Sequence, residues 1–438
     1  MEKKTLPTVA GGGLLDRRAF LASSARYTAV AMTAALAPRL EAAPASPGTA
    51  APVGAAMPGW MTALGAPDVA YGNPSPHESG VRRIPPAIDE NQPAQTAGMT
   101  VWQTPLAQLQ GIITPNGLHY GVHHNGIPEI DPGKHRLMIH GLVKQPLKFD
   151  LERLLRYPLA TRIQFLECAG NTAVNAAPMA MDHSCQDLYG QASCSEWVGV
   201  PLSWLLNEAG VKDNATWVIA EGADGGSHVR SVPLSAAMKD GMVALYQNGE
   251  RLRPSQGYPM RLFMPGWEGN VSVKWLHRLE LTDAPAYSKD ESGLYTQVMA
   301  NGQIQRFAFT MEVKSVITRP SGKMALPETK GFYEISGLAW SGDGRIAKVE
   351  VSADGGKSWA AAQLHGPVLE RAFTRFTIPW FWNGEKRILL SRATDEKGRV
   401  QPTRDQWKKR YAAHSFNHYN AIQAWKVNRN GRVENVYA

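Results

Sequence analysis

Alternation of apolar and polar side chains along the last third of the chain predicts a series of short β-strands. Segments such as Tyr333–Trp340 and Lys348–Ser352 alternate with a period of two residues. Turns rich in glycine and aspartate, at residues 342–344 and 354–356, separate them. Short alternating strands divided by such turns are typical of an immunoglobulin-like β-sandwich. We therefore expect an immunoglobulin-like domain over residues 311–438.

Upstream of residue 310 the pattern changes to short apolar runs interleaved with few helical segments. Asp150 is a candidate N-cap for a helix over Leu151–Arg156, and a second helix over Val200–Leu206 is followed by Gly210. The strands that we expect here are Arg136–Gly141, Thr216–Ala220, Met242–Leu245, Arg261–Met264 and Val273–Leu276. Strands mixed with few helices favour an α+β domain built on mixed sheets, over residues 105–310.

The first 45 residues have the pattern of a twin-arginine export signal. Arg17 and Arg18 precede an apolar pair, an alanine-rich run follows over residues 29–37, and residues 43–45 form an A-x-A processing site. The apolar run is too short to span a bilayer. These features predict a periplasmic protein that is exported in the folded state and has no membrane span. Residues 46–104, rich in Pro, Gly, Ala and Ser, are expected to form an extended segment rather than a domain.

Length and composition restrict the remaining possibilities. At 438 residues the chain is long enough for two domains, and its 43% hydrophobic and 19% charged residues describe a globular protein with well-filled cores. The net charge of +8 is spread along the chain without a block of Lys and Arg. A nucleic acid is therefore not an expected partner.

Cys168 lies where an apolar run enters a turn, within Phe165-Leu166-Glu167-Cys168-Ala169-Gly170-Asn171. A strand that ends in such a turn holds a thiol rigidly at the mouth of a sheet, where a ligand can approach closely. On these residues alone, the cysteine is either an inert core residue or a reactive or metal-binding thiolate.

The other candidate ligands form no standard haem or zinc motif. The chain has three cysteines and no C-x-x-C-H sequence, which excludes a covalent haem and an all-cysteine iron–sulfur cluster within it. Several histidines precede Cys168, but their spacing matches no standard zinc pattern. Cys185 and Cys194 are compatible with a disulfide and equally with two buried free thiols.

The Cys168-Ala169-Gly170-Asn171 turn resembles the turn that supplies the protein thiolate on molybdenum in the sulfite oxidase family of molybdopterin enzymes, and the resemblance covers residues 105–438. It implies that Cys168 is the metal ligand and that each subunit binds one molybdenum-molybdopterin cofactor. The residues that it assigns to cofactor binding are His119, Tyr120, His123, Asp224, Gln256, Arg261, Ser272, Val273 and Lys274. Arginine and lysine suit the anionic phosphate of this cofactor. The sandwich resembles the family's dimerisation domain.

Three positions depart from the sulfite oxidase pattern. Val122 and Ala173 stand where the family presents arginines to a sulfate-like anion, and His228 stands where the family has an active-site tyrosine. Loss of two guanidinium groups removes bidentate recognition of a free oxyanion. Together with Ser193–Trp197 and Asn420–Trp425, these changes resemble the sulfane dehydrogenase branch, the molybdenum subunit of the periplasmic Sox thiosulfate-oxidation system.

The resemblance implies an oxidoreductase that oxidises sulfane sulfur bound to a cysteine of a carrier protein, with water as oxygen source and a c-type cytochrome subunit as electron acceptor. It also implies a homodimer through the C-terminal domain, within a heterotetramer. The alternative within the family is a sulfite dehydrogenase that reduces cytochrome c. From a different class, a secreted sandwich-type binding module without a redox role is the alternative. The catalytic candidates besides Cys168 are His124 and His228; these two and His123 could handle protons or be structural.

Overall fold

The structure is a computed structural model that describes residues 8–16, 61, 64, 67–85, 98–327, 330–412 and 417–437. The twin arginines, the alanine-rich run and the expected processing site lie outside the described residues. The chain divides into two compact units, one of residues 1–16 with 82–438 and one of residues 17–81. The described part of the second unit contains the 3₁₀-helix η4, Pro76–Glu78. None of the described helices has both the length and the apolar character needed to cross a bilayer.

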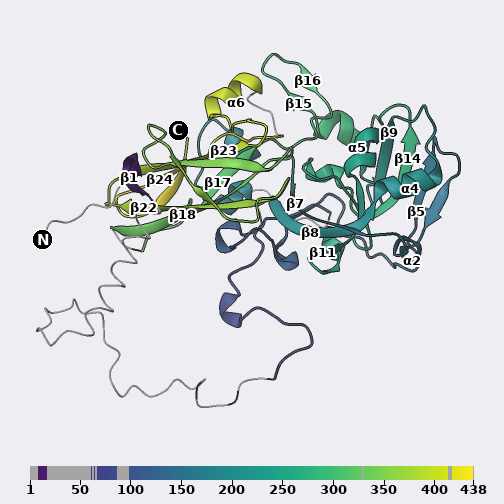
Figure 1. Cartoon of the computed structure of the whole chain (residues 1–438), viewed down its shortest axis with the longest axis horizontal. Helices are drawn as coiled ribbons and strands as arrows, with labels where there is room; N and C mark the ends of the chain where they lie inside the picture. Colours follow the sequence, from purple (N-terminus) through teal and green to yellow (C-terminus); the bar gives the residue numbers. More distant parts are fainter. Residues whose placement is uncertain are drawn as a thin grey trace, which may run out of the picture. The chain divides into compact units, whose positions relative to one another are not determined.

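Two five-stranded sheets form the part of the chain between residues 105 and 310 (Figure 1, teal). The first sheet has the order β10-β9-β14-β5-β6 and consists of β5 (Leu137–Gly141), β6 (Leu147–Phe149), β9 (Trp217–Gly222), β10 (Val229–Pro233) and β14 (Leu276–Thr282). The second has the order β12-β11-β8-β7 with β13 beside β11, and consists of β7 (Ala160–Glu167), β8 (Ala192–Pro201), β11 (Met242–Gln247), β12 (Glu250–Arg251) and β13 (Arg261–Phe263). Strands β14 and β5 pair in parallel and their neighbours pair antiparallel, which confirms the expected mixed sheets.

Short helices connect these strands. The α-helices are α2 (Leu151–Leu154), α3 (Cys185–Tyr189), α4 (Leu202–Ala209) and α5 (Leu234–Asp240). The 3₁₀-helices are η5 (Leu106–Gln108), η6 (Asn116–Leu118), η7 (Ala173–Ala176), η8 (Pro254–Gln256) and η9 (Gly269–Val271). Asp150 caps α2 as expected, since its carboxylate accepts from the N–H of Arg153 at 2.8 Å. Gly210 ends α4 in the left-handed conformation, at φ 69°.

The C-terminal part is a β-sandwich, as the alternating pattern predicts (Figure 1, green to yellow). One sheet has the order β1-β2-β22-β18-β17 with β21 beside β22; its strands are β1 (Thr8–Ala10), β2 (Leu14–Leu15), β17 (Lys314–Arg319), β18 (Gly331–Trp340), β21 (Gln363–Leu364) and β22 (Thr374–Trp382). The other has the order β20-β19-β23-β24-β25; its strands are β19 (Ile346–Ser352), β20 (Ala360–Ala361), β23 (Arg387–Asp395), β24 (Ala424–Val427) and β25 (Val433–Val436). Helix α6 spans Arg404–Arg410.

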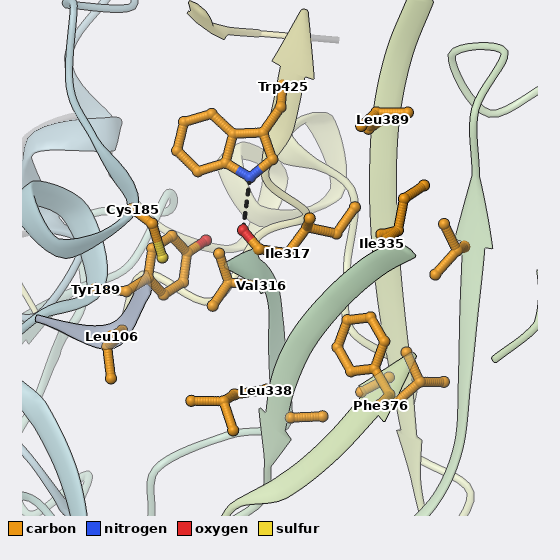
Figure 2. Close-up of a cluster of buried hydrophobic side chains, with 14 of the residues drawn as sticks. Leu106, Cys185, Tyr189, Val316, Ile317, Ile335, Leu338, Phe376, Leu389 and Trp425 are labelled. Atoms are coloured by element: carbon orange, nitrogen blue, oxygen red, sulfur yellow. Dashed lines mark hydrogen bonds between the residues drawn. The ribbon is translucent and has the colours of Figure 1, made fainter. Parts of the chain in front are cut away.

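The sandwich and the preceding region share a hydrophobic core. Figure 2 shows Cys185 and Tyr189 of α3 beside Val316 and Ile317 of β17. In the same cluster the indole N–H of Trp425 donates to the carbonyl of Ile317 at 2.9 Å. A continuous core fixes the sandwich firmly against the region that contains Cys168.

The expected strand over Val273–Leu276 is wrong. Regular structure begins only at Leu276, where β14 starts, because Trp275 has a positive φ of 52° that breaks the extended backbone. Residues 273–275 instead form a wall of the pocket described below. The apolar run in the sequence reflects burial at this wall rather than a strand.

Two further two-stranded sheets complete the fold near the pocket. They are formed by β3 (Thr100–Trp102) with β4 (Gly121–His123), and by β15 (Gln297–Val298) with β16 (Ile304–Gln305). Between β14 and β15 the π-helix η10 spans Asp290–Leu294.

Cys168, Cys185 and Cys194 are all free thiols. Of the two open alternatives for Cys185 and Cys194, the structure therefore has the pair of buried thiols.

Candidate active site

A pocket is lined by loops that leave both sheets of the region before residue 310. The site residues that the sequence assigns and that line it are Tyr120, His123, His124, Cys168, Asp224, His228, Gln256, Arg261, Ser272, Val273 and Lys274. His119 is the assigned residue that does not line it. Residues separated by up to about 150 positions in the sequence thus converge on one cavity, as a single binding site requires.

Cys168 directly follows β7, and backbone hydrogen bonds hold it on both sides. Its N–H donates to the carbonyl of Gln191 at 2.9 Å, and its carbonyl accepts from the N–H of Asn171 at 3.0 Å. Burial raises the pKa of the Cys168 thiol to about 11, because a thiolate here would lose its hydration. A bound metal cation replaces the thiol proton outright. The position therefore suits a metal ligand better than a free nucleophilic thiolate.

The sandwich anchors the loop that carries Cys168. Glu167, the residue before the cysteine, accepts hydrogen bonds from the ammonium group of Lys314 at 2.6 Å and from the indole of Trp340 at 2.7 Å. Lys314 and Glu167 are 1% and 0% exposed, so this ion pair is fully shielded from water. On the other side of the cysteine, the carbonyl of Ala169 accepts from the N–H of His418 at 2.9 Å. Three contacts from residues beyond 310 thus position the thiol.

Two cations face the pocket without acidic partners among the described residues, the buried Arg261 and the half-buried Lys274. Arg261 donates to the carbonyls of Ser272 at 2.6 Å and Gln256 at 3.1 Å, and Lys274 donates to the carbonyl of Val122 at 2.8 Å. Within the described part of the chain neither forms an ion pair, and Arg261 Nε is buried without a hydrogen-bond partner. Burial lowers the pKa of Arg261 to about 10, and burial together with Arg261 lowers the pKa of Lys274 well below its usual value. An anion bound in the pocket would relieve both depressions, because it would balance the positive charge.

His123 and His119 are neutral and held by their neighbours. His123 Nε2 lies 3.0 Å from the carbonyl of Ser255, so it carries the proton, and the hydroxyl of Thr100 donates to Nδ1 at 3.1 Å. Burial, and then Lys274, lowers the pKa of His123 to about 3. His119 lies behind the pocket wall, fully buried, and burial lowers its pKa to about 3 as well. Neither ring is set to exchange a proton near neutral pH.

His228 is fixed by three oxygen acceptors. Its Nδ1 lies 3.0 Å from the carboxylate of Asp290 and its Nε2 lies 3.0 Å from the carbonyl of Asn270. Its backbone N–H donates to Asp224 at 3.1 Å. Burial alone would raise the pKa of Asp224, but this bond and one from Asn125 lower it, so Asp224 is an anion. Because both ring nitrogens already have acceptors, His228 has a fixed position in the pocket wall beside Asp224.

Tyr295 is a pocket residue that sequence reasoning missed. Its hydroxyl lies 3.5 Å from His124 Nε2, its ring lies against His228, and the guanidinium of Arg230 lies 4.7 Å from the ring centre. Burial raises the pKa of Tyr295, so it remains a neutral donor. No motif marks it, because it follows the irregular helix η10, which sequence patterns do not reveal. Tyr295 and the exposed His124 form the polar part of the wall.

A buried charge network supports this wall from behind, and it was also missed. Arg230 contacts Glu268 at 3.4 Å and Glu291 at 3.0 Å, and His418 contacts Glu268. Burial alone would raise the pKa of Glu268, but its interactions with His418 and Arg230 lower this pKa overall. Its members come from separate segments of the chain and pair only in three dimensions. Isolated charges in a sequence carry no signal for such pairing.

The two positions at which the sequence lacks family arginines differ in location. Val122 lines the pocket, whereas Ala173, in η7, does not. The cations that line the pocket within the described residues are Arg261, Lys274 and any protonated histidine. Backbone carbonyls hold both Arg261 and Lys274. Arg261 is only 2% exposed. The accessible wall at Val122 therefore offers an apolar surface where an anion-binding side chain would be expected.

Comparison with known proteins identifies both domains. Residues 124–289 match the oxidoreductase molybdopterin binding domain, and residues 305–424 match the Mo-co oxidoreductase dimerisation domain. Among solved structures, the crystal structure of the sulfane dehydrogenase SoxCD from Paracoccus pantotrophus is similar, with 42% sequence identity and a TM-score of 0.85. The similarity covers 89% of this chain and 100% of that chain.

Curated relatives include plant nitrate reductases. The chain is 32% identical to the NADH nitrate reductase of Solanum lycopersicum and 31% identical to NADH nitrate reductase 1 of Arabidopsis thaliana, over 345 residues in each case. These alignments cover 70% of this chain and 38% of each relative. The chain thus spans about two fifths of the length of these relatives.

The residues of the pocket fit a molybdopterin cofactor. The buried Arg261 and the half-buried Lys274 form no ion pair within the described residues, which suits a site for an anionic phosphate, and the N–H at Arg261 Nε is an unused donor. Cys168 supplies a soft sulfur ligand at the same cavity. This donor set and the two matching domains agree with the sequence resemblance. The chain therefore belongs to the sulfite oxidase family of molybdopterin-binding oxidoreductases, with a C-terminal Mo-co dimerisation domain.

Proposed function

We propose that this chain is a periplasmic sulfane dehydrogenase. It oxidises sulfane sulfur held on a cysteine of a carrier protein, takes oxygen from water and delivers electrons to a c-type cytochrome. The similarity to the sulfane dehydrogenase SoxCD at 42% identity supports this choice within the family. Periplasmic location is part of the proposal and rests on the twin-arginine signal over residues 1–45.

The observation that carries the substrate proposal is the apolar side chain of Val122 in the pocket wall. Arg261 and Lys274, the two long cations of the pocket, are tied to carbonyls and suit the cofactor phosphate. No accessible guanidinium among the described residues of the pocket is left to clamp a free oxyanion in bidentate fashion. A tethered substrate gains binding energy from carrier contacts remote from the metal, so it does not need such a clamp.

Each side chain of the site has a definite task in this proposal. Cys168 would ligate molybdenum, and Arg261 and Lys274 would bind the phosphate of the cofactor, with His123 held neutral beside Lys274. When bound, the cofactor supplies two-electron redox chemistry at molybdenum and oxygen transfer from water. Tyr295 and His124 lie together at the polar wall, where the hydroxyl of Tyr295 can donate a hydrogen bond to a water molecule and His124 can accept and return its proton. The chain offers no haem motif, so the electrons need an external acceptor.

Steady-state kinetics of the molybdenum-loaded protein test this proposal. We expect efficient turnover of a carrier protein that bears a cysteine persulfide and poor turnover of free sulfite, with cytochrome c as acceptor. Val122→Arg should raise kcat/KM for sulfite at least tenfold, because it places a guanidinium in the wall. Val400→Arg, an exposed position in the sandwich, is the matched control. Efficient oxidation of micromolar sulfite by the wild type, with no reaction of the carrier, would favour the sulfite dehydrogenase instead.

A further inference from the structure

The N-terminal segment 8–15 is folded onto the sandwich, more than 300 residues away in the sequence. It forms a hairpin of β1 and β2 around the glycine turn η1 (Gly11–Gly13), and Leu14 of β2 pairs with Trp380 of β22. On this side β22 is paired with β21 at Phe376 and Thr377, and the hairpin pairs with it further along, at Trp380. In Figure 1 this segment (purple) lies beside β22.

Specific polar contacts fasten the hairpin. The N–H of Gly11 donates to the hydroxyl of Ser358 at 2.7 Å, and the indole N–H of Trp380 donates to the carbonyl of Gly12 at 2.8 Å. Leu14 is 0% exposed and belongs to the sandwich core, and Leu15 is 4% exposed. A segment that merely lay on the surface would not bury two leucines and satisfy an indole N–H.

The surface beneath the turn leaves little room for side chains at its three glycines, and least at Gly12 and Gly13, which face backbone oxygens. A Cβ atom on Gly11 or Gly12 would lie 2.3 Å from an oxygen of Asp354 or Ala353, respectively. A Cβ atom on Gly13 would lie 2.1 Å from the carbonyl oxygen of Phe381. Gly12 and Gly13 also have positive φ angles of 75° and 97°, which side chains disfavour. The sequence Gly-Gly-Gly-Leu-Leu is therefore a shape-matched ligand for this part of the sandwich.

This ligand lies inside the export leader. Asp16 alone separates Leu15 from the twin arginines Arg17 and Arg18. We propose that the sandwich carries a binding site for the start of its own leader, residues 8–15, which adds to the free side of β22 by β-strand addition and departs when the leader is cleaved. The proposal rests on the leader assigned under the proposed function, and it does not depend on the substrate.

The receiving residues come from two separate stretches, 353–358 and 380–381, which meet only in the folded sandwich. An unfolded sandwich therefore has no such site. Docking of the segment next to the twin arginines becomes a signal that the C-terminal domain has folded, which suits an export route for folded proteins. Removal of the leader leaves one edge of this part of β22 unpaired, on the side opposite β18, at a position rich in aromatic residues.

Hydrogen exchange of the full-length, molybdenum-loaded protein tests this inference. We expect the amides of residues 11–15 to exchange at least tenfold more slowly than in Gly13→Val, whose side chain would meet Phe381. Gly302→Val, a positive-φ glycine with no neighbouring atom within 4 Å of its Cβ, is the matched control and should leave residues 11–15 protected. Equal exchange in the wild type and Gly13→Val would overturn the proposal.

A second experiment supplies the leader segment as a separate peptide. A synthetic peptide of residues 8–16, at a millimolar concentration comparable to that of a tethered segment, should bind the protein that lacks residues 1–45. The Leu14→Asp peptide should bind at least tenfold more weakly, because it places a charge in the core site. Binding of both peptides with equal affinity, or exported protein that retains residues 8–15, would contradict leader docking. Turnover of either sulfur substrate should be unchanged by the peptide, so this result is independent of the proposed function.

Discussion

Lys274 is a cation of the pocket wall whose charged form is destabilised in the protein without a ligand. Its side chain is half-buried, and the hydrogen-bond partner of its ammonium group is the carbonyl of Val122 rather than a carboxylate. Burial and the nearby Arg261 lower its pKa, which means that the charged form is destabilised. An anionic ligand reverses this cost. Without a bound anion, the positive charges of Lys274 and Arg261 are therefore not neutralised in the pocket.

Lys274→Met should therefore have opposite effects on stability and on cofactor content. The melting temperature of the cofactor-free protein should rise, because an unpaired half-buried cation is removed without loss of volume. Molybdopterin occupancy should fall about tenfold or more, since a charge-assisted hydrogen bond contributes about 1.5–3 kcal/mol. Scanning calorimetry and metal analysis measure the two effects. Lys148→Met, at an exposed position, should change neither, and full occupancy in Lys274→Met would refute the assigned role.

Buried neutral histidines predict a loss of stability in acid. In the folded protein the pKa of His119 and of His123 is about 3, compared with 6.5 for a free side chain. Below pH 6.5 the unfolded chain binds protons that the folded state rejects, so stability falls as pH falls and levels off near the folded pKa. Between pH 6.5 and about pH 5 each histidine should cost about 2 kcal/mol.

Denaturant unfolding at several pH values measures this slope. His119 and His123 contribute about equally to the change of unfolding free energy with pH. His119→Phe should therefore remove about half of their combined contribution, because a phenylalanine ring does not titrate. His77→Gln, at an exposed site, should leave the slope unchanged. A wild-type stability that is flat between pH 6.5 and about pH 5 would show that these rings are solvated.

The sequence predicted most pocket residues because they lie in short local motifs. Cys168 stands in a contiguous turn, and Arg261 and Lys274 lie on either side of one tight segment. Tyr295 and His418 reach the same region from distant, irregular segments, and their roles depend on tertiary contacts with His124 and Glu268. Local patterns carry no information about such contacts.

At the scale of elements, the end of β7 is fixed by the sandwich. Glu167, its last residue, is bound by Lys314 of β17 and by Trp340 of β18. The sequence predicted the strand and the turn, but not that a second domain would hold them. It also misplaced a strand over residues 273–276, because the positive φ of Trp275 is imposed by the pocket wall rather than by local propensity.

Lys314→Met should destabilise the protein by about 3–5 kcal/mol, because it leaves the carboxylate of Glu167 buried without its ionic partner. The double variant Glu167→Gln with Lys314→Met should recover part of this loss, since no charge is then buried alone. Chemical denaturation measures both. Lys397→Met removes an exposed ion pair with Asp343 and should cost less than about 1 kcal/mol. A similar small cost for Lys314→Met would show that the clamp has no structural importance.

At the scale of the whole molecule, two domains combine a cofactor pocket with an assembly module. Residues 305–424 match a dimerisation domain, which supports a homodimer. The shared core at Cys185, Tyr189 and Ile317 couples that module to the loop that carries Cys168. Contiguous packing therefore connects the sandwich to the region that carries Cys168.

Sedimentation equilibrium should give a mass of about twice 47.8 kDa for the full-length chain. We expect this mass with and without the cofactor, because the pocket is lined by residues before 310. A monomer at micromolar concentration would contradict the expected role of the sandwich.

Molybdenum K-edge X-ray absorption of the wild type and Cys168→Ser, at equal metal loading, tests the central claim most directly. The wild type should bind about one molybdenum per chain, and the variant should show one sulfur neighbour fewer and lose turnover while keeping its fold, because the softer thiolate ligand is replaced by a hydroxyl. Identical sulfur coordination and near wild-type turnover in Cys168→Ser would contradict the account.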